Sequence, residues 1–363
     1  MTRTPVIDIT DLYHPHQDAD DNLDLLVAYG LPEIDLLGVI LDAHQAYRQP
    51  VATGVGPGLW EDPDGPREPG FIPVLQLDYL FNRATPCAVG PFTPMRSPDD
   101  AMLDAPAFQQ QGVKLLLRLL RDSPRPVQVI VQGSSRPLAV ALNREPDLLA
   151  AKIERVHLCA GATTTQFLEW NVALDPHATV RLLRSKLPVV LYPPATGEGP
   201  FAMDAHNVYW RLETRAWMQD MEPRLRRYLD FVYGRAQRMD FLRALDEDGP
   251  AQANAEIYAA GQHLWTTAMW MEITGRRLAR NLDGAYRLAA PRDRTPGGAV
   301  LAHALRPCEL EVRDDGRYSY NLGGQPTARW IYERDDLPGQ ARALNQAFPA
   351  LLLDFNPDED RRG

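Results

Sequence analysis

Residues 6–40 read VIDITDLYHPHQDADDNLDLLVAYGLPEIDLLGVI and decide the fold class. Pro5 to Thr10 is an apolar, β-branched run suited to a buried strand, and Leu36 to Leu41 has the same character. Between them, Asp21 to Tyr29 carries apolar residues at helical spacing, with acids in the first turn, where they favour a helix N-terminus. A strand–loop–helix–strand unit of this kind predicts a parallel sheet with right-handed crossovers.

The alternation of strands and helices continues through the first half of the chain. Further strands are predicted at Val127 to Val131, Arg155 to Cys159 and Pro188 to Tyr192, and helices at Gln111 to Arg121 and from about Pro176. This pattern predicts an α/β fold with a Rossmann-like, doubly wound and mostly parallel sheet flanked by helices. Ligands of such sheets bind beyond the carboxyl ends of the strands.

The remaining segments complete one domain over residues 1–363. The stretch from Val51 to Gly70 is dense in Gly and Pro and is predicted to be a loop. A mainly helical insertion is expected around 205–290. Cys308 to Tyr320 alternates in polarity around an Asp-Gly pair, which predicts a β-hairpin.

The composition limits the classes of partner. The 363 residues carry a formal charge of −10 and a pI near 5.3, which argues against a nucleic-acid surface, because phosphate neutralisation needs clustered Lys and Arg. Three widely spaced cysteines fit a reducing compartment and give no zinc spacing. The first residues are too short and too acidic for a signal peptide, and no later stretch reaches membrane-spanning length. We expect a cytoplasmic protein that binds neither nucleic acid nor membrane.

The loop after the first strand is rich in aspartate. Its acids, with one more a helical turn later, are Asp8, Asp11, Asp18, Asp20, Asp21 and Asp24. So many carboxylates repel one another unless a cation shares them, and oxygen ligands suit Ca²⁺ or Mg²⁺ better than zinc. The alternative is a solvated acidic loop in which Asp20 and Asp21 cap the helix.

This region resembles the inosine–uridine preferring nucleoside hydrolases. That family begins with an apolar strand and a D-x-D-P-G-x-D-D loop, followed by a helix and P-E-I-x-L-x-G-V. The match here is close from Asp20 through Leu31-Pro-Glu-Ile-Asp-Leu-Leu-Gly-Val-Ile40. The loop is longer than the family's, with LYHPHQ in place of a tight Pro-Gly turn.

Two later segments extend the resemblance to about Leu191. Glu169-Trp170-Asn171-Val-Ala-Leu-Asp-Pro is similar to the family's E-F-N-x-x-x-D-P segment, in which Glu and Asn bind the ribose hydroxyls. Carboxylate and amide groups are suited to such hydrogen bonds. VQVIVQGSSRP resembles a strand that ends in P-T-G-G-x-T-N, where a main-chain carbonyl ligates calcium, and Gln132 takes that position.

Two positions depart from the family pattern. In the family's A-x-x-H-D-P helix start, His assists the leaving base and Asp ligates calcium. His263 matches the His, but Leu264 stands at the Asp. The family's ribose-binding Asn after the second strand is replaced by Gln45.

The resemblance implies hydrolysis of the N-glycosidic bond of a nucleoside or nucleoside-like ribosyl compound, with Ca²⁺ as cofactor and a homodimer or homotetramer as the assembly. The implied catalytic residues are Asp11 (or Asp8), which activates water, and His263, which faces the leaving base. The implied substrate-binding residues are Asp20, Glu169, Asn171 and Gln45. The implied metal ligands are Asp8, Asp11, Asp18, Asp21 and the carbonyl of Gln132.

Two alternatives stay open at this point. Leu264 and the rebuilt loop are compatible with a non-catalytic relative that binds a nucleoside or related ligand. The rebuilt loop, His14 to Gln17, is also compatible with an enzyme that acts on a modified or antibiotic nucleoside.

Overall fold

The computed structural model describes residues 3–48, 67–249, 251–293, 300–325 and 327–358. Of the predicted loop from Val51 to Gly70, positions 51–66 lie outside the described residues. Helix α2 (Phe71–Phe81) follows it directly.

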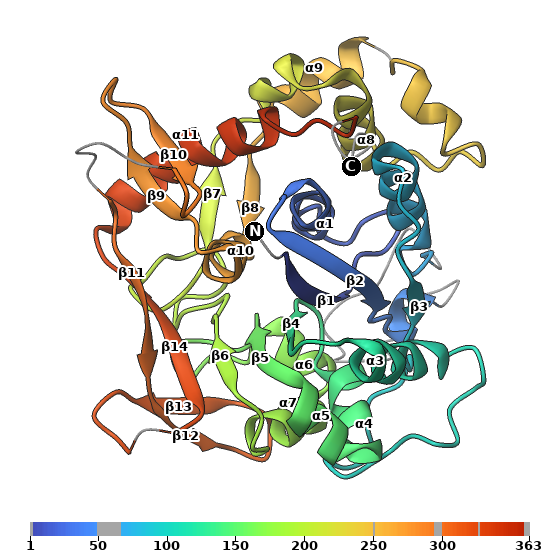
Figure 1. Cartoon of the computed structure of the whole chain (residues 1–363), viewed down its shortest axis with the longest axis vertical. Helices are drawn as coiled ribbons and strands as arrows, with labels where there is room; N and C mark the ends of the chain where they lie inside the picture. The colour runs from blue at the N-terminus through green and yellow to red at the C-terminus, as the bar shows by residue number, and fades with distance from the viewer. Residues whose placement is uncertain (1–2, 49–66, 250, 294–299, 326, 359–363) are drawn as a thin grey trace.

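An eight-stranded sheet forms the centre of the molecule (Figure 1). Its strands, in spatial order, are β11 (His303–Pro307), β14 (Arg329–Arg334), β6 (Val189–Leu191), β5 (Ile153–Leu158), β4 (Val127–Val131), β1 (Thr4–Thr10), β2 (Ile34–Leu41) and β3 (Cys87–Val89). All neighbours pair in parallel except β11 and β14. The predicted doubly wound, mostly parallel sheet is confirmed.

Helices cover both faces of this sheet (Figure 1). On one side lie α1 (Asp20–Gly30), α2, α8 (Pro223–Tyr233), α9 (Ala251–Ala259), α10 (Thr267–Thr274) and α11 (Leu337–Leu353). On the other lie α3 (Gln111–Asp122), α4 (Arg136–Arg144), α5 (Pro146–Lys152), α6 (Trp170–Leu174) and α7 (Pro176–Leu183). Short 3₁₀ turns are η1 (Gln45–Arg48), η2 (Ala216–Asp220) and η3 (Arg243–Asp246). Because both faces are covered, the central strands are buried almost throughout and read as continuous apolar runs.

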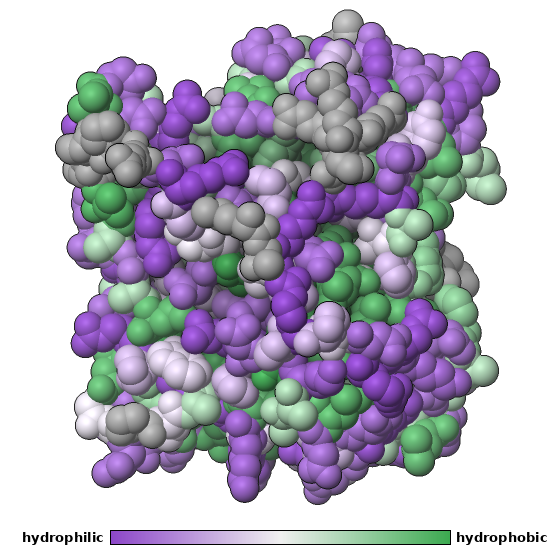
Figure 2. Space-filling model, in the orientation of Figure 1, coloured by the Kyte–Doolittle hydropathy of each residue, from purple (hydrophilic) through white to green (hydrophobic). Residues whose placement is uncertain are grey.

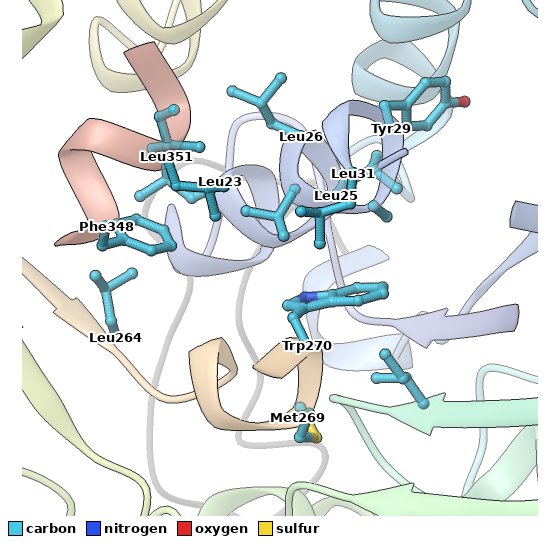
Figure 3. Close-up of a cluster of buried hydrophobic side chains, with 14 of the residues drawn as sticks. Leu23, Leu25, Leu26, Tyr29, Leu31, Leu264, Met269, Trp270, Phe348 and Leu351 are labelled. Atoms are coloured by element: carbon cyan, nitrogen blue, oxygen red, sulfur yellow. The ribbon is translucent and has the colours of Figure 1, made fainter. Parts of the chain in front are cut away.

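One of the two apolar clusters of the core joins helices from distant parts of the chain (Figure 3). Leu23 and Leu25 of α1 lie close to Trp270 of α10, and Phe348 of α11 lies in the same cluster. The C-terminal helix therefore completes the core that the first helix begins. Hydrophilic side chains predominate on the outer face seen in Figure 2, where hydrophobic ones form scattered groups. Among the described residues, none of the helices combines the length and the apolar character needed to cross a bilayer.

The segment around 205–290 is mixed rather than mainly helical. Besides its helices it contains the antiparallel pairs β7 (Trp210–Leu212) with β8 (Gln262–Leu264), and β9 (Arg277–Arg280) with β10 (Tyr286–Ala289). Gly261 permits the β7–β8 pairing, because a Cβ there would lie 2.6 Å from the carbonyl oxygen of Leu212. The predicted C-terminal hairpin is confirmed as β12 (Glu309–Val312) and β13 (Tyr318–Asn321).

The order of the strands reverses between β1 and β4. From β1 the chain winds outward through β2 to β3, and from β4 it winds the other way through β5 and β6. The two loops that leave this reversal point diverge and open a crevice, which is where doubly wound sheets bind ligands. Asp11 follows β1 and Gln132 follows β4, so the fold brings both to this crevice.

Candidate active site

A cavity of about 200 Å³ lies at the carboxyl ends of the central strands. Its lining residues are Asp11, Gln17, Asp18, Asp20, Asp21, Gln132, Cys159, Glu169, Trp170, Asn171, Pro194, Pro200, Phe201, Trp265 and Thr266. A larger hollow of about 580 Å³ lies between β9–β10 and α11, and its lining includes none of these residues. We take the smaller cavity as the site, because it gathers buried polar groups at the reversal point of the sheet.

Most of the predicted site residues meet in this cavity. Seven of them line it: Asp11, Asp18, Asp20, Asp21, Gln132, Glu169 and Asn171. Asp8 lies in β1 beneath the cavity, where its Oδ1 accepts a hydrogen bond of 3.0 Å from Nε2 of Gln132. Gln45 begins η1 and is not among the lining residues, so its contact with ribose stays a prediction.

The aspartates of the first loop raise one another's pKa values. Burial raises the pKa of Asp21 well above its usual range, and repulsion by Asp11, Asp18 and Asp20 adds to the effect. Burial raises the pKa of Asp11 in the same way, and repulsion by Asp42 is the next largest contribution. These carboxylates are held against one another by the fold, so the site attracts positive charge.

A second layer of donors lies below the loop, around Asp24. Burial raises the pKa of Asp24 to about 7, while hydrogen bonds from Thr266, Trp270 and Gln132 act in the opposite direction. The indole Nε1 of Trp270 donates directly to Asp24. The Gln132 side chain therefore donates to two buried acids, Asp8 and Asp24. This use of the side chain was not predicted, because the resemblance concerned only the Gln132 carbonyl.

Glu169 and Asn171 are fixed by main-chain partners. Glu169 caps α6, with Oε1 accepting from the Asn171 amide at 2.9 Å and Oε2 from the Gly161 amide at 2.8 Å. Burial raises the pKa of Glu169 to about 7. Nδ2 of Asn171 donates to the carbonyls of Gln132 (2.6 Å) and Cys159 (2.9 Å). Both amide hydrogens are thus used, and Oδ1 is left to accept a hydroxyl from the cavity.

His263 lies in a group of aromatic rings at the edge of the cavity. Its Nδ1 is 2.8 Å from the hydroxyl of Tyr209, and its ring centroid is 4.6 Å from that of Phe201. Trp265, which lines the cavity, is 6.1 Å from His263 between centroids. Burial lowers the pKa of His263, with a further contribution from Arg211, so its imidazole is neutral near pH 7.

The structure places the Leu264 side chain in the apolar core, 1% exposed, in the cluster that holds Phe348 (Figure 3). The expected helix start is wrong here, because residues 262–264 form strand β8 and α10 begins only at Thr267. Neighbours in a strand point to opposite faces, so Leu264 points away from the side on which His263 lies. His263 is not among the residues that line the cavity and reaches its edge through Phe201 and Trp265. Of the residues that follow the strand, Trp265 and Thr266 both line the cavity.

The same segment also holds two acids of the loop, one through its main chain and one through a side chain. The Trp265 amide donates to Oδ2 of Asp20 at 2.9 Å, and Nε2 of Gln262 donates to Oδ1 of Asp18 at 3.2 Å. Where the family pattern predicts a carboxylate ligand, this chain therefore supplies hydrogen-bond donors to two carboxylates.

The rebuilt loop is packed against the protein rather than open to solvent. The His14 ring stacks on Phe231 with centroids 5.1 Å apart, and Arg67 donates to the carbonyl of Pro15 at 3.0 Å. Arg235 donates to the carbonyl of His16 at 3.0 Å. Neither histidine lines the cavity, and only Gln17 of this stretch does.

A buried arginine orders the loops on the far side of the cavity. Arg136 is fully buried, with Nε 2.9 Å from Oδ2 of Asp175 and Nη1 3.5 Å from Oδ1 of Asp42. It also donates to the carbonyls of Ala43 and Pro91. One side chain thus joins the loops that follow β2, β3 and β4 to the end of α6.

The donor chemistry of the loop fits a hard cation such as calcium. Oδ2 of Asp8, Oδ1 of Asp20 and Oδ2 of Asp24 are buried without a hydrogen-bond partner. Such oxygens cost free energy unless a proton or a cation satisfies them. In the described ranges, however, no three His, Cys, Asp or Glu side chains converge as a metal-ligand group. The donors are suitable in kind, and they need side-chain rotations to meet around one ion.

Comparison with known proteins agrees with this geometry. A sequence model of the family "inosine-uridine preferring nucleoside hydrolase" matches residues 70–277. The chain is 34% identical over 100 residues to the pyrimidine-specific ribonucleoside hydrolase RihA of Salmonella arizonae, covering 26% of this chain and 32% of that protein. It is 27% identical over 181 residues to RihA of Salmonella paratyphi A, covering 47% of this chain and 56% of that protein. The matches thus span about half or less of these curated relatives.

Solved structures share the fold over almost the whole chain. The purine-preferring ribonucleoside hydrolase of Gardnerella vaginalis has a TM-score of 0.57 at 15% identity, covering 96% of this chain and 99% of that one. A plant nucleoside hydrolase has a TM-score of 0.54 at 14% identity, covering 97% and 99%. Since the family's sequence model matches more than half of the 363 residues, this chain belongs to the inosine-uridine preferring nucleoside hydrolase family.

Proposed function

We propose that the protein hydrolyses the N-glycosidic bond of a nucleoside or nucleoside-like ribosyl compound and releases the base and ribose. The observation that carries the proposal is the convergence of Asp11, Asp20, Glu169 and Asn171 on one cavity at the reversal point of the sheet. The relatives are named pyrimidine-specific and purine-preferring, so the base is left open.

The ribose hydroxyls would be held by three groups on fixed elements. Asp20, at the start of α1, presents Oδ1, because its Oδ2 is occupied by the Trp265 amide. Glu169 and Asn171 present acceptor oxygens from the start of α6. Because the fold already fixes these acceptors, they bind a vicinal diol at little cost in conformational entropy. Hydrogen bonds to the ribose that become shorter in the oxocarbenium-like transition state would stabilise that state. Gln45 is a further proposed contact from η1.

Water would be activated by Asp11. As water attacks the anomeric carbon, its proton passes to Asp11 and the bond from that carbon to the base nitrogen breaks. We propose Asp8, Asp11, Asp18, Asp21 and the Gln132 carbonyl as the ligands of Ca²⁺. When bound, calcium would lower the pKa of a coordinated water.

The departing base would receive a proton or hydrogen bond from His263. A tautomer in which Nδ1 accepts from the Tyr209 hydroxyl carries its proton on Nε2. Neutral imidazole near pH 7 can donate a hydrogen bond through this N–H to a base nitrogen that gains negative charge. Trp265 and Phe201 provide an aromatic wall beside it.

The direct test is to incubate the pure protein with a panel of purine, pyrimidine and modified nucleosides, and to assay free ribose. Asp21→Ala should abolish release at saturating calcium, whereas the exposed Asp104→Ala should not change it. Binding of nucleosides without any release of ribose would indicate a binding protein instead, and release at the wild-type rate in Asp21→Ala would remove that residue from the site.

Location and assembly are also proposed. Cys87, Cys159 and Cys308 are all free thiols, which supports a reducing compartment such as the cytoplasm. A homodimer or homotetramer is proposed on family membership, and light scattering of the eluted protein tests it.

A further inference from the structure

The C-terminal hairpin β12–β13 packs on the outside of the segment that carries Glu169. Its turn lies against α6 and α7, since a Cβ at Gly316 would be 2.7 Å from Cγ1 of Val172 and 3.3 Å from the Cα of Pro176. Nη1 of Arg317 donates to the carbonyl of Thr165 at 3.1 Å. The hairpin therefore contacts both the loop that leads to Glu169 and the helices that follow this residue.

Tyr318 is the residue of this hairpin that reaches furthest toward the site. It is 2% exposed, and its hydroxyl donates to the carbonyl of Ala160 at 2.9 Å. Its ring lies directly on Gly161, where an added Cβ would be 2.4 Å from Cε1 of the tyrosine. Gly161 has φ +90°, a conformation that favours glycine. The Tyr318 ring and the Gly161 backbone are therefore packed in direct contact, with no room for a side chain between them.

The peptide that Tyr318 holds is the one that binds Glu169. The Gly161 amide, which follows the Ala160 carbonyl, donates to Oε2 of Glu169 at 2.8 Å. The Tyr318 hydroxyl and the Glu169 carboxylate therefore bind the two ends of a single planar peptide unit. A tilt of that peptide would move the carboxylate in the cavity.

We propose that Tyr318 is a positioning residue for Glu169, and that the hairpin sets how well the site holds a ribose hydroxyl. The role in ribose binding rests on the proposed function. Tyr318 lies outside residues 70–277, which the family's sequence model matches. The proposal therefore gives a function to a part of the chain that the model does not cover.

The kinetic test uses Tyr318→Phe, which keeps the ring and removes the hydroxyl. We expect kcat/KM for a ribonucleoside to fall about tenfold, because small displacements of a substrate-holding group are costly. In the Glu169→Gln background the same substitution should change kcat/KM less than twofold, since its effect passes through Glu169. Tyr320→Phe, on the same strand with its ring 5.5 Å from His206, is the matched control and should match wild type.

A second readout does not depend on turnover. The readout is the NMR signal of the Gly161 amide in protein labelled with ¹⁵N-glycine. This signal is assigned by its change in Glu169→Gln. It should shift in Tyr318→Phe and stay in place in Tyr320→Phe. A wild-type protein that releases no ribose would refute the proposed function alone, because this signal still tests the contact. The proposal is overturned if the Gly161 signal is unchanged in Tyr318→Phe, or if the tenfold loss persists in the Glu169→Gln background.

Discussion

Two groups of buried acids lie at the same edge of the sheet and differ in how their charge is balanced. Asp42 and Asp175 share the guanidinium of Arg136, so the chain itself supplies that group with a cation, and we call it the balanced group. In the first loop, by contrast, the strongest charged influences on Asp21 are other carboxylates. A group that the chain balances itself serves the fold. A group left unbalanced depends on a proton, a cation or a ligand from outside, which marks it as the binding site.

The largest expected effect is on the balanced group. Arg136→Met should lower the free energy of unfolding by about 3–5 kcal/mol, because it leaves two buried carboxylates without their partner. Urea denaturation measures this. Arg96→Met is the control, since Arg96 pairs with Asp100 and Asp104 at the exposed surface and its loss should be close to neutral. An Arg136→Met variant with the wild-type free energy of unfolding would contradict the distinction between the two groups of acids.

The next effect concerns the residue at the family's ligand position. Leu264→Ala should cost about 2–5 kcal/mol as a core truncation. Leu264→Asp should cost at least as much and bring no gain in calcium affinity, because the side chain lies in the apolar core. Thermal unfolding and calcium titration measure the two outcomes. Tighter calcium binding by Leu264→Asp would show that position 264 faces the ion.

The burial of Glu169 should make the free energy of unfolding depend on pH. Its pKa is raised to about 7, from about 4.5 in the unfolded chain, so the folded state binds the proton more tightly. As pH rises from about 4.5 to 7, wild type should therefore lose on the order of 2 kcal/mol more stability than Glu169→Gln, which keeps the other buried acids. Melting curves in chelator at several pH values compare the two. Parallel pH profiles for wild type and variant would contradict the burial argument.

The smallest expected effect is on the unbalanced group in the absence of metal. Asp21→Asn should stabilise the protein in chelator at pH 7 by on the order of 1 kcal/mol, because it removes one of the mutually repelling charges. The same variant should lose any rise in melting temperature that calcium produces in wild type. The control Asp104→Asn should neither stabilise the protein in chelator nor change its response to calcium. Destabilisation by Asp21→Asn in chelator would place Asp21 among the structurally balanced acids.

Much of the site could be predicted because it depends on local order along the chain. Asp11, Glu169 and Asn171 each follow a strand that the apolar pattern reveals, and parallel strands place such residues at one edge. The roles of Arg136 and Leu264 could not be predicted in this way. The role of Arg136 depends on two acids distant in the sequence, one after β2 and one after α6. Leu264 lies in a strand, in a segment that was expected to be helical. The strands β11 and β14 and helix α11 were likewise not predicted.

The pairing of β14 with β6 also has a consequence during synthesis. β6 is complete once Leu191 has been made, but its partner at Arg329–Arg334 is made more than 130 residues later. Until then the nascent sheet carries an open, apolar edge of the kind that pairs with other chains. We therefore expect chaperones to be needed most in this interval, and premature termination before residue 329 to yield aggregates rather than a smaller folded product.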